Sequence, residues 1–457
     1  MTRDDLEVVF EAERGRFLDE WQTFLRFSSI SADPAHHDEC LACAHWLKTH
    51  VNSIGFDARL LETGTKPVVY GERRAAPGAP TILFYGHYDV QPPDPLEAWD
   101  SPPFEPAIRD QRVYARGAED NKGQLFYVLK ALETLISRDA LHVTVKVFIE
   151  GEEECGSSGL SGQLDKWRDQ LAADVLLVCD TGCIDNDTPT IIMGLRGLVH
   201  ANVRVSGPTQ DLHSGVHGGK APNPAVALAR LIATLHNDDG SVAVDGFYDG
   251  VVGPSERERA LANMIPHDDT RYRQETGVPA VGGEARFTPL ERAGFRPSLD
   301  VNGMCAGYTG AGVKTIIPAT AEAKLTARIV AGQDPMVCLA ALEDHLRDHA
   351  PDGLQIEILD SGAGGPGFRL DLDSPAIARA ARVLESQSGR QPAFLWEGAS
   401  IPVVASLAAT AGAAPLLVGF GLEMDRIHAP NESFGIEQFR RGFLFAGAFL
   451  GQYADTP

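Results

Sequence analysis

The feature that most limits how this chain can fold is the stretch at 143–158, VTVKVFIEGEEECGSS, where an apolar run leads directly into three adjacent glutamates. Runs rich in Val, Ile and Phe are typical of strands buried in a sheet, and α/β proteins gather their chemistry at the carboxyl ends of such strands. Because three carboxylates repel one another, we expect a positive charge beside Glu152, Glu153 and Glu154. A solvated acidic turn is the alternative for this stretch taken alone.

Other apolar runs also end in polar residues. The run at 81–85 leads into His87 and Asp89, the run at 174–179 leads into Asp180, and Asp120 stands at the entrance of a helical pattern at 125–138. Apolar runs alternate with helical patterns through this half of the chain. Such patterns predict helices at 4–27, at 37–54 and near 160–171, and two further helices are predicted late in the sequence, at 373–388 and 436–454. The alternation predicts an α/β fold with a mostly parallel sheet.

The pattern changes at 197, where strands with two-sided alternation and amphipathic helices predict a separate α+β module. Because 457 residues exceed one ordinary core, we expect a first domain formed by 1–196 and 367–457 and interrupted by a second at 197–366. Residues 238–300, rich in Gly, Pro and charge, indicate an insertion within the second domain.

The composition excludes several classes of partner. Lys and Arg number 40 against 63 Asp and Glu, a formal charge of −23, which argues against nucleic acid and anionic membranes. We expect a cytoplasmic protein, because there is neither a signal-peptide pattern nor an apolar run of about 18 residues. Cys40 and Cys43 have CxxC spacing within a helical pattern, without a second pair, and are interpreted as packing residues.

The polar residues after the strands, together with a later histidine, are metal-ligand types: His87, Asp89, Asp120, Glu152, Glu153, Glu154, Asp180 and His428. Imidazoles mixed with carboxylates favour zinc, manganese or cobalt over calcium or magnesium. A set of this size could hold two ions with one bridging carboxylate, and a further Glu could act as general base. Taken singly, each residue could equally be a helix cap or a hydrogen-bonding side chain.

The chain resembles the aminoacylase/carnosinase family of two-zinc metallopeptidases, and most of all its cytosolic dipeptidase branch. The similarity runs in order through GHYDVQP (86–92), ARGAEDNKG (115–123), EGEEECGSSGL (150–160), DTG (180–182), DLHSGVHGG (211–219), EGASIPV (397–403) and HAPNE (428–432). It implies a catalytic domain of zinc-aminopeptidase type and a ferredoxin-like lid domain through which two subunits form a homodimer.

The resemblance also implies the site residues. One metal would be held by His87, Asp120 and Asp180, and the other by Asp120, Glu154 and His428, with Asp120 bridging. Glu153 would be the general base, and Asp89 would orient His87. The family further implies a cis peptide after Asp120.

In the second domain, the resemblance implies that His213 reaches the partner subunit's site and stabilises the oxyanion. Arg328 would bind the substrate carboxylate, and Ser400 would contact the substrate. Cys155 departs from the family, which usually has Ser there, and could be sensitive to oxidation.

The function implied is hydrolysis of the amide bond of dipeptides or short peptides with a free C-terminal carboxylate, through a metal-bridged water and a Glu base. An N-acyl or N-carbamoyl amino acid amidohydrolase is the alternative on the same site. A noncatalytic binding protein would lack a ligand or the base, yet every expected position is filled. A serine hydrolase would need a GxSxG elbow, which the sequence lacks.

Overall fold

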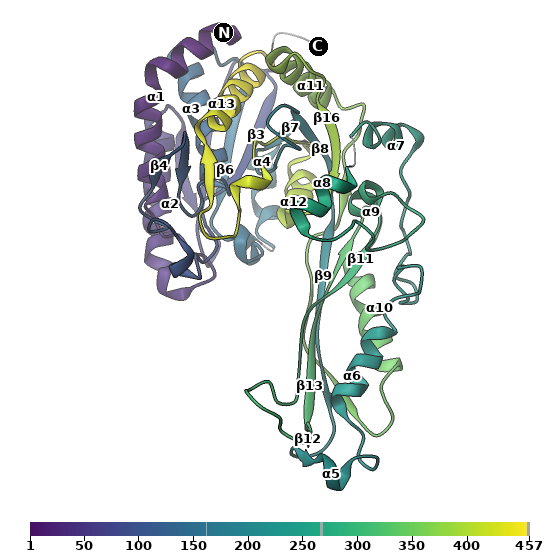
Figure 1. Cartoon of the computed structure of the whole chain (residues 1–457). Coiled ribbons are helices and arrows are strands. Elements are labelled where there is room, and N and C mark those ends of the chain that lie inside the picture. The colour runs from purple at the N-terminus through teal and green to yellow at the C-terminus, as the bar shows by residue number, and fades with distance from the viewer. Residues whose placement is uncertain (161, 266–267, 455–457) are drawn as a thin grey trace. The chain divides into compact units, whose positions relative to one another are not determined.

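Figure 1 shows the computed structural model of the chain, which describes residues 1–160, 162–265 and 268–454. Two compact units are present. The first comprises Met1–Met193, Leu370–Phe394 and Ser406–Pro457, and the second comprises Gly194–Arg369 and Leu395–Ala405. Residues 395–405, which were expected in the first domain, group with the second unit, where hydrogen bonds join them to Arg196.

The first unit is built on a large mixed sheet, so the predicted α/β fold is confirmed. The pairings among β6 (Thr144–Glu150), β3 (Thr81–His87), β7 (Val175–Val178) and β17 (Ala414–Leu417) are parallel, whereas the strands at both edges pair antiparallel. The central strands are buried along almost their whole length, which explains their unbroken apolar runs. The strand order is β1 (Asp57–Leu61), β2 (Val68–Arg73), β6, β3, β7, β17, β8 (Thr190–Leu195) and β15 (Phe368–Arg369), and β16 (Ala393–Glu397) also pairs with β8. Of these strands, β15 and the last residues of β8 and β16 belong to the segments of the second unit.

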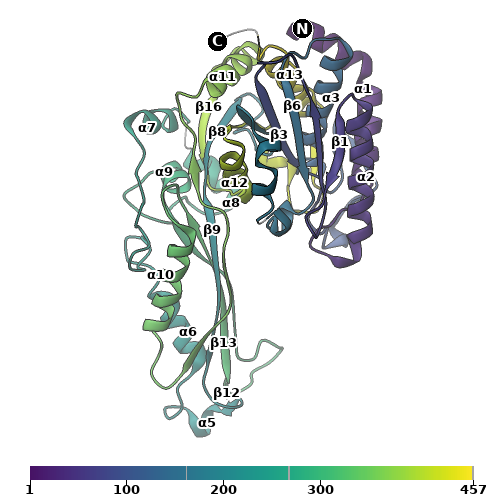
Figure 2. The same cartoon turned by 180° about the vertical axis from the view of Figure 1, so that it is seen from behind.

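Helices cover this sheet (Figure 2). The predicted amphipathic helices at the N-terminus are α1 (Arg3–Leu25) and α2 (His37–Ser53), and α3 (Lys122–Ser137), α11 (Pro375–Ser388) and α13 (Ile436–Gly451) were also predicted. Cys40 and Cys43 are buried in α2, which confirms their packing role. The helix predicted near 160–171 is wrong for the described residues there, which form 3-10 turns followed by the short α4 (Arg168–Leu171).

Smaller elements complete the first unit. A three-stranded antiparallel sheet is formed by β18 (Ser433–Gly435), β5 (Arg112–Tyr114) and β4 (Ala107–Arg109). The helix α12 (Pro402–Ala411) begins in the segment that groups with the second unit. No helix of the described residues combines the length and the apolar character needed to cross a membrane.

The second unit is a four-stranded antiparallel sheet with helices on one face, the ferredoxin-like arrangement that was predicted. Along β9 (Gly197–Ser206), buried and partly exposed residues alternate strictly, so one face of the sheet forms the core. Asn223 caps α6 (Pro224–Ala233) and Asp334 caps α10 (Pro335–Asp348), and each cap is followed by a proline at the first helical position. In chain order the elements are β9 (Gly197–Ser206), α6 (Pro224–Ala233), β11 (Ser298–Ala306), β13 (Thr320–Ile329), α10 (Pro335–Asp348) and β14 (Gln355–Ala363), with strand order β11-β13-β9-β14.

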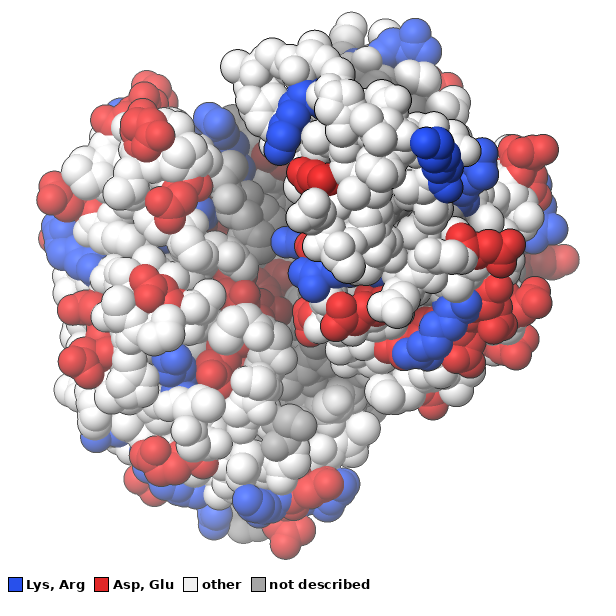
Figure 3. All heavy atoms as spheres, turned by 90° about the horizontal axis from the view of Figure 1, so that it is seen from below, with Lys and Arg blue, Asp and Glu red and all other residues white. Residues whose placement is uncertain are grey.

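The described residues of 238–300 form three short helices, α7 (Glu256–Ala262), α8 (Asp269–Thr276) and α9 (Pro289–Phe295), before β11 begins at Ser298. The start of this segment belongs to the core of the unit, since Val242, Val244 and Phe247 are buried against the sheet. On the face drawn in Figure 3, the Lys and Arg side chains of the described residues lie among Asp and Glu without forming a broad basic surface.

Candidate metal centre

The predicted ligands follow the carboxyl ends of three adjacent parallel strands. His87 is the last residue of β3, Glu153 and Glu154 lie in a 3-10 turn three residues after β6, and Asp180 lies two residues after β7. Because β6, β3 and β7 are neighbours in parallel register, these ends share one edge of the sheet. The loop before α3 supplies Asp120, and the loop before β18 supplies His428.

The structure brings the five predicted ligands together as two groups that share Asp120. His87, Asp120 and Asp180 form one group, and Asp120, Glu154 and His428 form the other, with the ligand atoms of each group within 4.8 Å of one another. The two oxygens of Asp120 are divided between the groups. Oδ1 lies 3.1 Å from His87 Nε2, and Oδ2 lies 2.8 Å from His428 Nε2. This division is the geometry that a bridging carboxylate requires.

Neighbouring groups hold these ligands in orientation. His87 Nδ1 lies 3.1 Å from the Asp89 carbonyl and 3.4 Å from its carboxylate, so the Nδ1 proton is placed on that side and Nε2 faces the other ligands. The Asp89 carboxylate accepts the backbone N–H groups of Glu153 and Glu154 at 3.2 and 3.1 Å. Asn121 donates to Asp180 at 2.7 Å. The Asp120–Asn121 peptide is cis, as predicted.

The electrostatics of the cluster favour cations. Hydrogen bonds with Asp120 and Glu154 raise the pKa of His428 to about 10. Although burial opposes it, the Asp180 charge and the adjacent Asp120 carboxylate raise the pKa of His87 well above its ordinary value. Burial and the Asp120 charge raise the pKa of Glu154 to about 7. The surrounding carboxylates therefore stabilise positive charge at both imidazoles.

The residues fit a pair of divalent ions. His87 Nε2 is buried and has no hydrogen-bond partner among the described residues, although it points at two carboxylates. A lone pair held in this way is suited to a metal bond, and a ligand set of imidazoles and carboxylates is typical of zinc and related transition ions.

The three adjacent glutamates occupy different environments. Glu152 accepts hydrogen bonds from the Thr65 hydroxyl at 2.6 Å and from Gly159 N–H at 3.0 Å, so it anchors the turn. Glu154 faces Asp120 and His428, whereas no hydrogen bond of the described residues involves the Glu153 carboxyl. Burial raises the pKa of Glu153 well above its ordinary value; His87 opposes this rise, and the charges of Asp180 and Asp120 add to it. Such a carboxyl is suited to accept a proton.

Two residues that support the ligands were not singled out from the sequence, although both lie in the quoted motifs. Gln91 donates to Glu154 Oε2 at 2.8 Å. Glu432 is fully buried and accepts from Arg116 at 2.7 Å and from the backbone N–H groups of Gly117, Glu119 and Asp120 at 3.0, 3.0 and 3.2 Å. Glu432 therefore holds the loop that carries the shared aspartate.

The remaining predicted residues lie in the second unit. Arg328, on β13, donates from Nη1 to the Ser400 hydroxyl at 2.7 Å, so the two predicted substrate-binding residues are in contact. His213 ends β10 (Leu212–His213), which precedes α5 (Ser214–His217), and is exposed. Its Nδ1 accepts the Gly215 N–H at 3.0 Å, which assigns the ring proton to Nε2. Within the described part of the chain, Nε2–H of His213 makes no hydrogen bond and can serve as a donor.

A further group of ligand types contains Glu20, His50 and Glu133. The positive charge that balances these two carboxylates is already supplied by the chain, because the buried Lys130 ammonium contacts the Glu133 carboxylate at 2.7 Å and also pairs with Glu20. The group is therefore an ion-pair network and not a second metal site.

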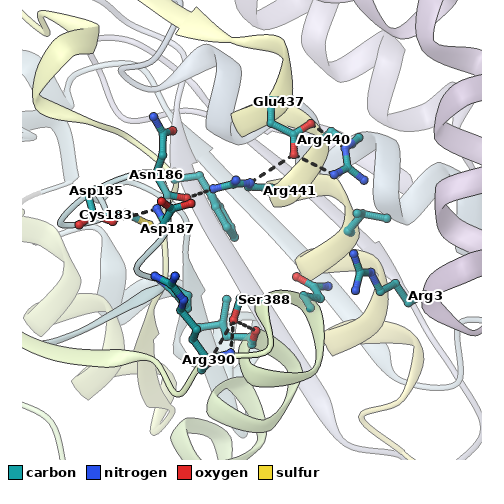
Figure 4. A pocket seen from close by; sticks show the side chains of 15 residues that line it. Arg3, Cys183, Asp185, Asn186, Asp187, Ser388, Arg390, Glu437, Arg440 and Arg441 are labelled. Carbon is teal, nitrogen blue, oxygen red and sulfur yellow. Dashed lines mark hydrogen bonds and ion pairs between the residues drawn. The ribbon is translucent and has the colours of Figure 1, made fainter.

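A cavity of about 330 Å³ lies elsewhere in the first unit (Figure 4). Glu437 pairs with Arg440 and Arg441, and Arg441 also donates to the Asn186 carbonyl. Cys183 lies on the wall, but none of the predicted ligands does. The charges on this wall are largely paired within the chain, and the cavity is separate from the metal ligands.

Comparison with known proteins identifies the family. The model of peptidase family M20/M25/M40 matches residues 83–452. The chain belongs to this family. Among curated relatives, the Cys-Gly metallodipeptidase of Candida albicans is 27% identical, over 98% of this chain and 96% of its own, and human Beta-Ala-His dipeptidase is 29% identical, over 94% and 85%.

Among solved structures, the M20 family metallo-carboxypeptidase of Sulfolobus solfataricus is 31% identical over 96% of this chain and 99% of its own, with a TM-score of 0.86. The family resemblance inferred from the sequence motifs is therefore confirmed, and the chain is an enzyme of a peptidase family.

Proposed function

We propose that this enzyme is a two-metal hydrolase of dipeptides or very short peptides with a free C-terminal carboxylate. The observation that carries the proposal is the division of the Asp120 oxygens between two ligand groups, one closed by His87 and Asp180 and the other by Glu154 and His428. The names of the relatives support dipeptides, because two curated proteins similar over most of this chain are a Cys-Gly and a Beta-Ala-His dipeptidase.

In this proposal the five ligands hold two divalent ions, with zinc favoured and manganese or cobalt possible by the same donor set. Such ions supply Lewis-acid polarisation of a carbonyl and activation of a water. Glu153 accepts the proton of the attacking water and returns it to the leaving amine. Asp89 keeps the Nδ1 proton of His87 in place, so that Nε2 is available as a ligand.

The second unit is proposed to act as lid and dimerisation domain. Arg328 binds the substrate carboxylate, since a guanidinium matches a carboxylate in charge and shape, and Ser400 lies beside it. His213 donates a hydrogen bond from Nε2–H to the developing oxyanion of the partner subunit's site.

The proposal is tested with Glu153→Gln and a substrate panel. The variant should keep about two metals per subunit by elemental analysis, while kcat falls by a factor of about 10²–10⁴. Turnover at the wild-type rate with the metals in place would remove Glu153 from the role of base. Dipeptides, longer peptides and N-acyl or N-carbamoyl amino acids should be compared by kcat/KM, because preference for an acylated amino acid over every dipeptide would replace the peptidase assignment with the amidohydrolase one.

A further inference from the structure

Arg196 holds a loop that lies about 200 residues away in the sequence. It stands between β8 and β9, and its backbone N–H donates to the Ala399 carbonyl at 3.1 Å. Its side-chain Nε donates to the Gly398 carbonyl at 3.2 Å, and its own carbonyl accepts the Ser400 hydroxyl. Main chain and side chain of one residue thus bind three consecutive residues of the loop.

The loop in turn holds Arg328. The Ser400 hydroxyl proton is directed to the Arg196 carbonyl, which can only accept, so the Ser400 oxygen is free to accept the 2.7 Å bond from Arg328 Nη1. Among the residues that the structure describes, the Nε and Nη2 groups of Arg328 make no hydrogen bond. These donors remain available to a ligand.

The contact between Arg196 and the loop is close. A Cβ at position 398 would lie 2.5 Å from Arg196 Nη2, so the guanidinium packs directly on the glycine backbone. The Arg196 guanidinium also lies near that of Arg328. Burial and then the Arg328 charge lower the pKa of Arg196 to about 10, and the Asp300 charge opposes this change. Two guanidinium groups that repel each other are complementary to an anion.

We propose that Arg196 is a positioning residue for recognition of the substrate's C-terminal carboxylate. By clamping residues 398–400 it places Ser400, and Ser400 holds Arg328 in the orientation that leaves its remaining N–H groups free for the carboxylate. This inference rests on the proposed function. All of its members belong to the second unit, so that unit assembles the anion site from its own residues.

The test compares a good dipeptide substrate with its C-terminal amide, by kcat/KM, in Arg196→Met, Arg328→Met and the wild type. We expect the wild-type preference for the free carboxylate to fall by about 100-fold in Arg328→Met and by about tenfold in Arg196→Met, since hydrogen bonds to charged groups are the strong ones. In Arg196→Met the change should appear mainly in KM. Arg347→Met, at an exposed α10 side chain paired with Glu343, is the matched control and should keep the wild-type preference.

Two further variants separate positioning from charge and from misfolding. Arg196→Lys keeps the charge but not the guanidinium geometry, so its preference for the free carboxylate should stay as low as in Arg196→Met. A wild-type preference in Arg196→Lys would refute the proposal that Arg196 positions residues 398–400. Gly398→Ala disturbs the same contact from the loop side without removing a charge, and it should reproduce the KM effect even if Arg196→Met does not fold.

The outcomes distinguish this inference from the proposed function. An unchanged preference in folded Arg196→Met, together with a loss in Arg328→Met, would refute the role of Arg196 alone. A wild-type enzyme with no preference for the free carboxylate would instead remove carboxylate recognition from the proposed function.

Discussion

The strongest test of how the metal centre is supported is Glu432→Gln. The Glu432 carboxylate accepts four hydrogen bonds, and the substitution removes its charge and turns one of its two oxygens into a donor that faces donors. At about 1.5–3 kcal/mol for each bond to a charged group, simple addition would far overstate the effect, because burial raises the pKa of Glu432 and so penalises the carboxylate. We expect the free energy of unfolding to fall by about 3–5 kcal/mol, as is typical when one partner of a buried ion pair is removed.

The assay is urea unfolding at pH 7 followed by tryptophan fluorescence, with and without a chelator, since bound metal stabilises the folded state by mass action. The fluorescence reports mainly on the first unit, which contains four of the five tryptophans: Trp21, Trp46, Trp99 and Trp167. Metal content should fall as well, because Glu432 holds the Asp120 amide.

Two controls complete this experiment. Asp165→Asn removes an exposed ion pair with Arg168 and should cost at most about 1 kcal/mol. Combining Glu432→Gln with Arg116→Met should destabilise less than the sum of the single changes, because the two residues are in contact. If the free energy of unfolding of Glu432→Gln lies within about 1 kcal/mol of the wild-type value and the variant keeps both metals, the loop before α3 does not depend on this carboxylate.

Three further outcomes are expected. Mixing His213→Ala subunits with Glu153→Gln subunits should partly restore activity if His213 acts across a dimer; verified heterodimers without rescue would place it within one chain or outside catalysis. Gly215→Ala should lower kcat by about tenfold or more, because a Cβ there would lie 2.9 Å from His213 Cε1, and an unchanged kcat would show that the ring needs no such support. Burial and then the Lys130 charge lower the pKa of His50 to about 3. The contribution of the neutral ring to the free energy of unfolding is therefore fully present above pH 6.5 and is lost as the pH falls toward 3. The stability of His50→Phe should therefore fall less steeply than that of the wild type over pH 6.5–5, by up to about 1.4 kcal/mol per pH unit in urea titrations; parallel curves would contradict a ring that is neutral in the folded state.

Much of the local structure was predictable because periodicity records burial. The amphipathic patterns correctly predicted α1 and α2, and the apolar runs correctly predicted β3, β6 and β7. The helix predicted near 160–171 was wrong for its described residues because short turns there bury only a few side chains, among them Leu160, Leu164 and Leu171. Such a pattern resembles a helical face without supporting one.

For the site, the sequence by itself determined which residue types follow the strands, and its motifs indicated the family. Only the tertiary structure decided how they are used: Asp120 divides its oxygens between His87 and His428, which is 308 residues away. Glu152 turns from its neighbours toward Thr65. Residues 395–405 join the second unit through Arg196, although both flanking segments belong to the first. Periodicity reports only whether a side chain is buried, whereas these pairings depend on which distant surfaces the folded backbone brings within hydrogen-bonding distance.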